Sequence, residues 1–114
     1  MSYPTSLARL DAIGQAELTA RGDVSVAELL AACFERIERY DPLLRAVVDV
    51  ARAQPASLAP GPLHGVPFLV KDVMPWPELR WSMGSRLFAR NVTRRETPLG
   101  KRMSRAGLCC VGKS

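Results

Sequence analysis

The sequence GPLHGVPFLVKD at residues 61–72 combines a loop, a short apolar strand and two charges. Its glycines permit tight turns and its prolines cannot donate to a strand ladder, so the predicted strand is residues 68–70, with Val66 and Pro67 leading into it. A short, continuous apolar run is typical of a strand that is covered on both faces. Lys71 follows at the carboxyl end of this strand, where open α/β sheets bind their ligands.

Lys71 is the candidate catalytic residue of the chain. A lysine held against a buried strand is partly desolvated, which lowers its pKa toward the range in which the neutral amine can accept a proton. A general base must be able to accept a proton in this way. The alternative interpretation of Lys-Asp, taken as a dipeptide, is a solvated strand end.

Four segments of the chain, in the same order, resemble the amidase signature family of Ser–Ser–Lys carboxamide hydrolases. They are residues 25–42 (SVAELL to IERYDP), 61–72, 83–86 (MGSR) and 105–114 (RAG to GKS). Lys71 stands at the position of the family's catalytic lysine. The resemblance implies an α/β fold. The chain would form the N-terminal part of a mixed-sheet α/β/α amidase-signature fold. Residues 1–114 would be the N-terminal segment of a single amidase domain.

The family's nucleophilic and bridging serines lie in a Gly/Ser-rich stretch, and no such stretch occurs in residues 1–114. The resemblance therefore implies a chain that carries the base, Lys71, without the nucleophile. The full-length enzyme would hydrolyse carboxamide C–N bonds by the Ser-cisSer-Lys mechanism, with a small-molecule amide as substrate and with no cofactor or metal. The chain alone is expected to be inactive, since covalent catalysis needs the nucleophile.

Two other functions fit the sequence. Within the family, the chain could come from the catalytic subunit of an aminoacyl-tRNA amidotransferase. Residues 73–114 hold 9 basic and 2 acidic groups, whereas residues 1–72 hold 7 and 9. A solvated basic face is the favoured interpretation of this asymmetry, and no nucleic acid is expected as a partner. From a different class, the chain could be a non-catalytic binding or vestigial fragment that uses the loop between Trp76 and Trp81 as a contact.

Composition points to a folded globular segment. The chain has 114 residues, 47% hydrophobic and 24% charged, and no apolar run approaches the length of a membrane helix. Its N-terminus lacks the pattern of a secretory signal, so a cytoplasmic location is expected, with no membrane partner. The three cysteines have no metal-binding spacing and are expected to be reduced and buried. A homodimer of the full-length form is one option.

Apolar periodicity predicts two N-terminal helices. The first covers about residues 6–20 and is closed by Gly22. The second begins at a capping box of Ser25 and Glu28 and ends at Asp41-Pro42.

The remaining pattern predicts further elements. A strand is expected at 44–50, a non-helical linker at 51–60 and an irregular loop at 73–82. A short helix is expected from Ser85 through residue 90. A further helix starts at Thr97 or Glu96 before Pro98 and is closed by Gly107, with Leu99 and Met103 facing inward, and a buried strand follows at 108–111.

Two tempting motifs are interpreted structurally. Residues 107–114, GLCCVGKS, fit the phosphate-loop pattern G-x-x-x-x-G-K-(S/T). A helix is predicted before the first glycine and a strand across the motif, which is the reverse of what a phosphate loop needs. His64, the only histidine, lies in a turn with no candidate nucleophile near it in sequence.

Overall fold

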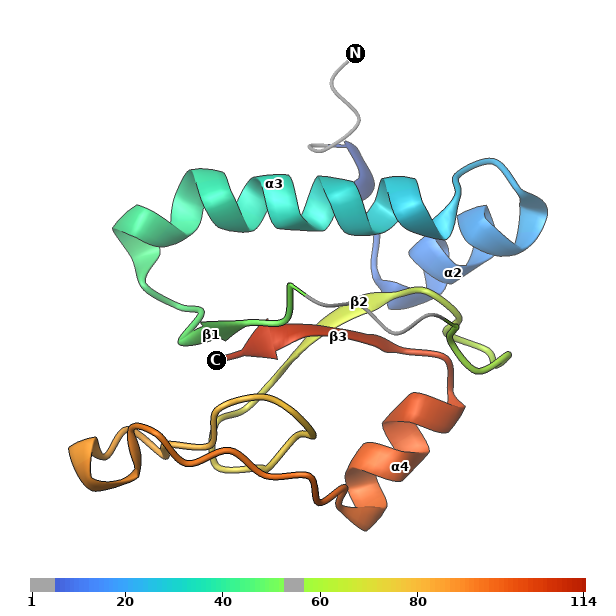
Figure 1. Cartoon of the computed structure of the whole chain (residues 1–114). Coiled ribbons are helices and arrows are strands. Elements are labelled where there is room, and N and C mark those ends of the chain that lie inside the picture. The colour runs from blue at the N-terminus through green and yellow to red at the C-terminus, as the bar shows by residue number, and fades with distance from the viewer. Residues whose placement is uncertain (1–5, 53–56) are drawn as a thin grey trace.

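The computed structural model describes residues 6–52 and 57–114 (Figure 1). Its elements are α2 (Ala12–Arg21), α3 (Val26–Leu44), β1 (Asp49–Val50), β2 (Pro67–Val70), the 3-10 helix η1 (Arg86–Phe88), α4 (Pro98–Arg105) and β3 (Cys109–Lys113). The predicted linker at 51–60 falls partly on residues 53–56, which lie outside the described residues, and the flanking parts of it are not helical.

The three strands form a mixed sheet in the order β1-β3-β2. Strand β3 pairs antiparallel with β1 and parallel with β2, where Pro67 aligns with Cys109 and Val70 with Lys113. This confirms the predicted mixed α/β arrangement. Every residue of β3 is buried, so the central strand forms the middle of the fold.

Helices lie on both sides of this sheet (Figure 1). Helices α2 and α3 cover one face, and α4 with the loop that follows β2 lies on the other. Each side has its own apolar cluster. The first contains Leu7, Val24, Leu29 and Ala32, with Leu18 packed against it; the second contains Val70, Leu79 and Cys110, with Ala51, Phe68, Met74 and Trp76 packed against it.

The first predicted helix is wrong at its start. Helix α2 begins at Ala12 because the carboxylate of Asp11 accepts a hydrogen bond from the Gly14 amide at 2.8 Å, which makes Asp11 an N-cap. The predicted C-terminal cap is confirmed: Gly22 adopts the left-handed conformation, φ 77°, and its amide donates to the carbonyls of Leu18 and Thr19.

The second predicted helix is correct at its start and wrong at its end. The capping box of Ser25 and Glu28 is present, but α3 continues through Pro42 to Leu44. Pro42 lies in the last turn, where its missing amide removes only one helical hydrogen bond. Asp41 then closes the helix: its carbonyl accepts from the Arg45 amide, and its carboxylate accepts from the amides of Ala46 and Val47.

The first two predicted strands differ from the structure in their bounds. The predicted strand 44–50 shrinks to Asp49–Val50, because Leu44 still belongs to α3. Strand β2 begins one residue earlier than predicted, at Pro67. The expectation that it is covered on both faces is wrong at Leu69, which the described residues leave 38% exposed. Strand β2 is also an edge strand of the described sheet.

The C-terminal half follows the predictions more closely. Ser85 caps a turn that is a 3-10 helix instead of an α-helix. Helix α4 begins with Thr97 as N-cap and Pro98 as its first residue, but Leu99 is exposed, contrary to expectation. Strand β3 begins one residue later than predicted, at Cys109, and continues two residues further, to Lys113.

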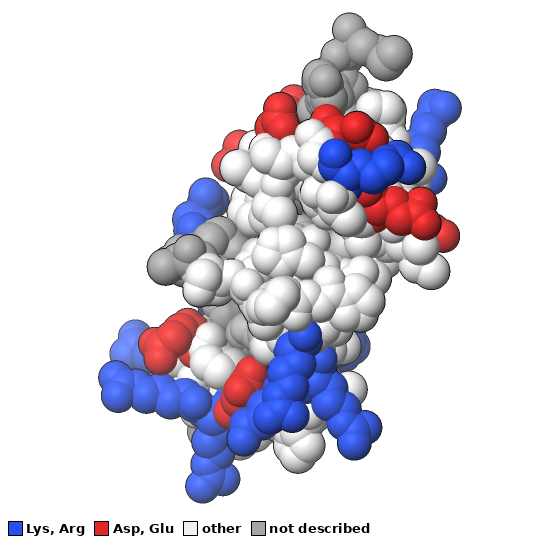
Figure 2. Space-filling model, turned by 90° about the vertical axis from the view of Figure 1, so that its right-hand side faces the viewer, with Lys and Arg blue, Asp and Glu red and all other residues white. Residues whose placement is uncertain are grey.

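Charge is distributed unevenly over the surface. In Figure 2 the Lys and Arg side chains gather at the lower end of the molecule, where α4 and the loop after β2 lie, with fewer acidic groups among them. The upper end, formed by α2 and α3, carries both signs. The sequence asymmetry is therefore also a spatial one.

Candidate active site

The carboxyl ends of β2 and β3 lie at one edge of the sheet because these strands are parallel. The backbone joins the two ends beyond the strands themselves. The Ser114 amide donates to the Val70 carbonyl and the Asp72 amide donates to the Ser114 carbonyl, both at 2.8 Å. The chain then turns, with the Met74 amide donating to the Lys71 carbonyl at 2.9 Å. Lys71 is thus held between two fixed backbone positions.

The Lys71 side chain is exposed. Among the described residues, no hydrogen bond or ion pair engages its ammonium group. The sequence predicted that the Lys71 side chain is partly desolvated. Residues 6–52 and 57–114 do not supply this desolvation, because β2 is an edge strand of the described sheet and nothing in these residues covers the side chain at its carboxyl end. The backbone is ordered around Lys71, while its side chain remains accessible.

Next to it, Asp72 and Lys113 form a buried ion pair. The Lys113 side chain is 0% exposed, and its Nζ lies 3.3 Å from Asp72 Oδ1. The same ammonium group donates to the Met74 carbonyl. Asp72 Oδ1 is buried and accepts no hydrogen bond from the described residues. Its burial is therefore compensated by the charge of Lys113.

The other carboxylate oxygen of Asp72 connects the strand end to the following loop. Ser82 Oγ donates to Asp72 Oδ2 at 2.8 Å. Burial acts to raise the pKa of Asp72, but the hydrogen bond from Ser82 and the interaction with the Lys113 ammonium group outweigh it and hold this pKa below its usual value. Asp72 is consequently a carboxylate at neutral pH.

The two tryptophans of this loop anchor it. The ring of Trp76 meets that of Phe68 edge to face, with centroids 5.4 Å apart, and belongs to the second apolar cluster. Trp81 Nε1 donates to the Val73 carbonyl at 3.3 Å. These contacts hold the loop against β2 and against its own first residues.

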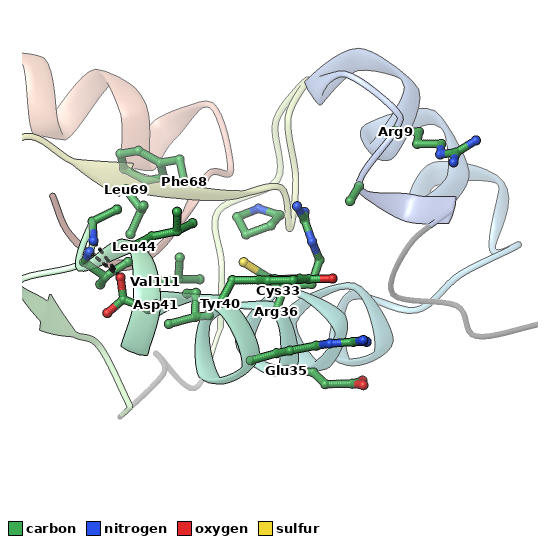
Figure 3. A pocket seen from close by; sticks show the side chains of 16 residues that line it. Arg9, Cys33, Glu35, Arg36, Tyr40, Asp41, Leu44, Phe68, Leu69 and Val111 are labelled. Atoms are coloured by element: carbon green, nitrogen blue, oxygen red, sulfur yellow. Dashed lines mark hydrogen bonds between the residues drawn. The ribbon is translucent and has the colours of Figure 1, made fainter.

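A groove of the described structure lies away from Lys71. This groove, of about 720 Å³, lies between α3 and β2. Its lining side chains include Cys33, Tyr40, Leu44, Phe68 and Leu69 (Figure 3). Lys71 does not line it. Burial raises the pKa of Cys33, against the opposing effect of Arg36, so its thiol stays protonated and is a poor nucleophile.

The phosphate-loop pattern has a structural explanation. Residues 109–113 form β3 and not a loop. A Cβ on Gly107, which has φ 90°, would lie 2.6 Å from the His64 Cα, and a Cβ on Gly112 would meet the carbonyl oxygen of Asp49. Lys113 is engaged with Asp72. Packing thus accounts for the two glycines of the pattern, and the ion pair accounts for its lysine.

The remaining candidates also have structural roles. His64 Nδ1 lies 2.9 Å from the Ala59 carbonyl in the turn before β2. Burial, with smaller contributions from its neighbouring cysteines, raises the pKa of Cys109 to about 11. Within the described ranges, no three His, Cys, Asp or Glu side chains are grouped as metal ligands. No described helix is long and apolar enough to cross a bilayer.

Comparison with known proteins identifies the family. A sequence profile described as Amidase matches residues 28–114. The chain belongs to the amidase family. This confirms the family predicted from residues 25–42, 61–72, 83–86 and 105–114.

Curated members of the amidase family align over much of the chain. A glutamyl-tRNA(Gln) amidotransferase subunit from Salinispora arenicola is 34% identical over 96% of this chain and 25% of its own length. The 6-aminohexanoate-cyclic-dimer hydrolase of a Pseudomonas species is 40% identical over 67 residues, which are 55% of this chain and 13% of that enzyme.

A solved structure supports the fold. A 6-aminohexanoate cyclic dimer hydrolase complexed with substrate superposes with a TM-score of 0.85 and 28% identity, over 91% of this chain and 23% of that one. The predicted fold class is thereby confirmed. The chain spans at most about a quarter of the length of these relatives.

Sequence reasoning missed part of this site. It singled out Lys71 but assigned no role to Asp72, Ser82 or Lys113. Lys113 is distant in sequence, and the phosphate-loop pattern offered a different interpretation of it. The available signal was a lysine close after the apolar run at residues 108–111, but the parallel pairing that brings it to Asp72 appears only in the structure.

Proposed function

We propose that the chain is the N-terminal segment of a single amidase domain and that Lys71 is its catalytic base. In the complete enzyme, the neutral amine of Lys71 would take a proton through a bridging serine and activate a serine nucleophile for attack on a carboxamide carbonyl. The acyl-enzyme would then be hydrolysed by water. Both serines would come from a Gly/Ser-rich stretch outside residues 1–114.

The position of Lys71 is the observation that carries this proposal. Lys71 follows β2 on the side of the sheet where the carboxyl ends of β2 and β3 lie. Its backbone is held on both sides there, and its side chain is accessible. The family match covers this position. In the complete enzyme, we expect further chain to cover the open edge of β2 and supply the desolvation that a lysine base needs.

The test is Lys71→Ala in the complete natural polypeptide that carries residues 1–114. Turnover would be measured on simple aliphatic and aromatic amides and on the cyclic dimer of 6-aminohexanoate. We expect kcat to fall by roughly 10²–10⁴-fold or more, as for loss of a general base. Lys101→Ala is the matched control, because Lys101 is an exposed lysine on α4. Retained turnover in Lys71→Ala would rule out the assignment.

A second candidate function is that of an aminoacyl-tRNA amidotransferase catalytic subunit. The relative from Salinispora arenicola bears this kind of name, and the basic end seen in Figure 2 offers positive charge to phosphates. Its most regular part is Lys101, Arg102 and Arg105 on α4, all exposed.

This second function predicts tRNA binding by the complete polypeptide. Replacing Lys101, Arg102 and Arg105 with Gln should weaken tRNA binding in a filter assay. The slope of the logarithm of the binding constant against the logarithm of salt concentration should become shallower by about one unit per lost phosphate contact. Amide hydrolysis with no tRNA affinity would favour the simple amidase. On either function we expect a cytoplasmic enzyme that uses no metal or organic cofactor.

A further inference from the structure

Lys113 is an unusual residue for the end of a buried central strand. Its side chain is fully buried and carries a charge that only Asp72 offsets among the described residues. A buried ion pair contributes little net stability compared with a packed apolar pair of similar volume. Stability alone therefore gives a weak reason for this pair at the middle strand.

The contacts of the pair surround Lys71. Asp72 follows Lys71 directly, and Lys113 contacts both the Asp72 carboxylate and the Met74 carbonyl. Ser82 binds the opposite oxygen of that carboxylate at 2.8 Å. The chain on the C-terminal side of Lys71 is therefore fixed by side chains from β3 and from the loop after β2.

The Lys71 side chain, in contrast, has no described partner to hold it. Its direction is set by the backbone from which it extends. A displacement of about 1 Å in a catalytic group can lower turnover on the order of 100-fold. Groups that fix this backbone can therefore act on catalysis without touching the substrate.

We infer that Lys113 is a positioning residue for Lys71, acting through Asp72 and the Met74 carbonyl. This inference rests on the proposed role of Lys71 as the base. Lys113 would have no contact with substrate, and its role would be to hold the end of β2 so that the Lys71 amine reaches the bridging serine.

The deciding experiment removes both charges together. Lys113→Met alone would leave Asp72 as an uncompensated buried charge and would destabilise the fold for that reason. The double variant Asp72→Asn/Lys113→Met has no such charge, so its thermal stability should recover relative to the single variants. The control is Glu38→Gln/Arg52→Met, which removes an exposed ion pair of 3.7 Å far along the chain from Lys71.

Three quantities would be measured in the complete enzyme: thermal stability, kcat with KM, and hydrogen exchange of the Asp72 and Ser114 amides. For the double variant we expect restored stability, faster exchange at these two amides, and a kcat that stays roughly 10- to 100-fold low with little change in KM. The control variant should match the wild type in all three. Recovery of kcat together with stability would overturn the inference, because the pair would then be purely structural.

If the double variant does not fold, Ser82→Ala decides. It removes one hydroxyl from the Asp72 carboxylate and leaves the ion pair intact. A several-fold loss of kcat at unchanged KM supports positioning, and an unchanged kcat contradicts it. Lys71→Ala tests the base separately, and amide exchange does not depend on turnover, so failure of the positioning inference can be distinguished from failure of the base assignment.

Discussion

Asp72 shows how a single carboxyl group can make the stability of this sheet edge depend on pH. Burial acts to raise its pKa, but Ser82 and Lys113 outweigh that effect and hold the pKa below its usual value. A carboxyl group whose pKa is lower in the folded state stabilises that state above the pKa of the unfolded chain, near 4. This stabilisation is lost as the pH falls through the folded-state pKa.

We therefore predict a specific acid sensitivity. In the complete enzyme, the melting temperature should fall below about pH 4 partly through protonation of Asp72. Asp72→Asn should be less stable at neutral pH, because Lys113 loses its counter-charge, and should lose less of its remaining stability on acidification. Calorimetry from neutral pH down to about pH 2.5 would check this. Parallel curves for the two proteins would show that Asp72 does not contribute.

Strand β3 depends on close backbone approach at Gly112. The residue pairs with Val50 of β1, and a Cβ there would collide with the Asp49 carbonyl oxygen. Backbone atoms of a paired strand cannot move away without breaking the ladder. The glycine is thus needed for packing of β1 against β3.

Gly112→Ala should therefore separate β1 from β3. We expect a loss of about 1–3 kcal/mol in the free energy of unfolding, as for other overpacked sites. Denaturant titration would measure it, with Gly14→Ala as control, because a Cβ at Gly14 would meet its neighbours at 3.4 Å, the edge of ordinary contact. Equal stability of Gly112→Ala and wild type would contradict this account of β3.

The molecule as described is open and flat. Its radius of gyration is 14.3 Å, against about 13 Å expected for a compact domain of this length. Several large apolar side chains are exposed, including Leu43 at 87% and Leu87 at 84%. Strand β2 has no described partner on its outer side. Such surfaces favour association with further chain.

We predict that residues 1–114, produced alone, self-associate and do not hydrolyse amides. Size-exclusion chromatography with light scattering would detect the association, and the amides used to test Lys71 would detect turnover. A monomer with a sharp, cooperative thermal transition would contradict the first expectation and favour the binding-fragment alternative. Measurable turnover would contradict the second, because it would require a nucleophile within this chain.

The sequence alone was sufficient to predict the family, the mixed α/β class and the position of Lys71 after a strand. It also placed the capping box of α3, the Gly22 cap and the start of α4 correctly. The family and fold class followed from the resemblance of four segments to the amidase signature family, whereas the caps depend on residues near one another in the chain, such as Ser25 with Glu28 or Thr97 before Pro98. Local hydrogen bonding and apolar periodicity are sufficient to define them.

Tertiary structure alone decided which residues surround Lys71 and how exposed it is. Asp72 and Lys113 are 41 residues apart, and only the parallel pairing of β2 with β3 brings them to 3.3 Å. The continuation of α3 through Pro42 was missed for a different reason, since the Asp41 carboxylate makes local contacts, with the amides of Ala46 and Val47, that the helix-ending pattern of Asp-Pro did not predict. Contacts between distant segments follow from strand order and register, which periodicity within one segment does not specify.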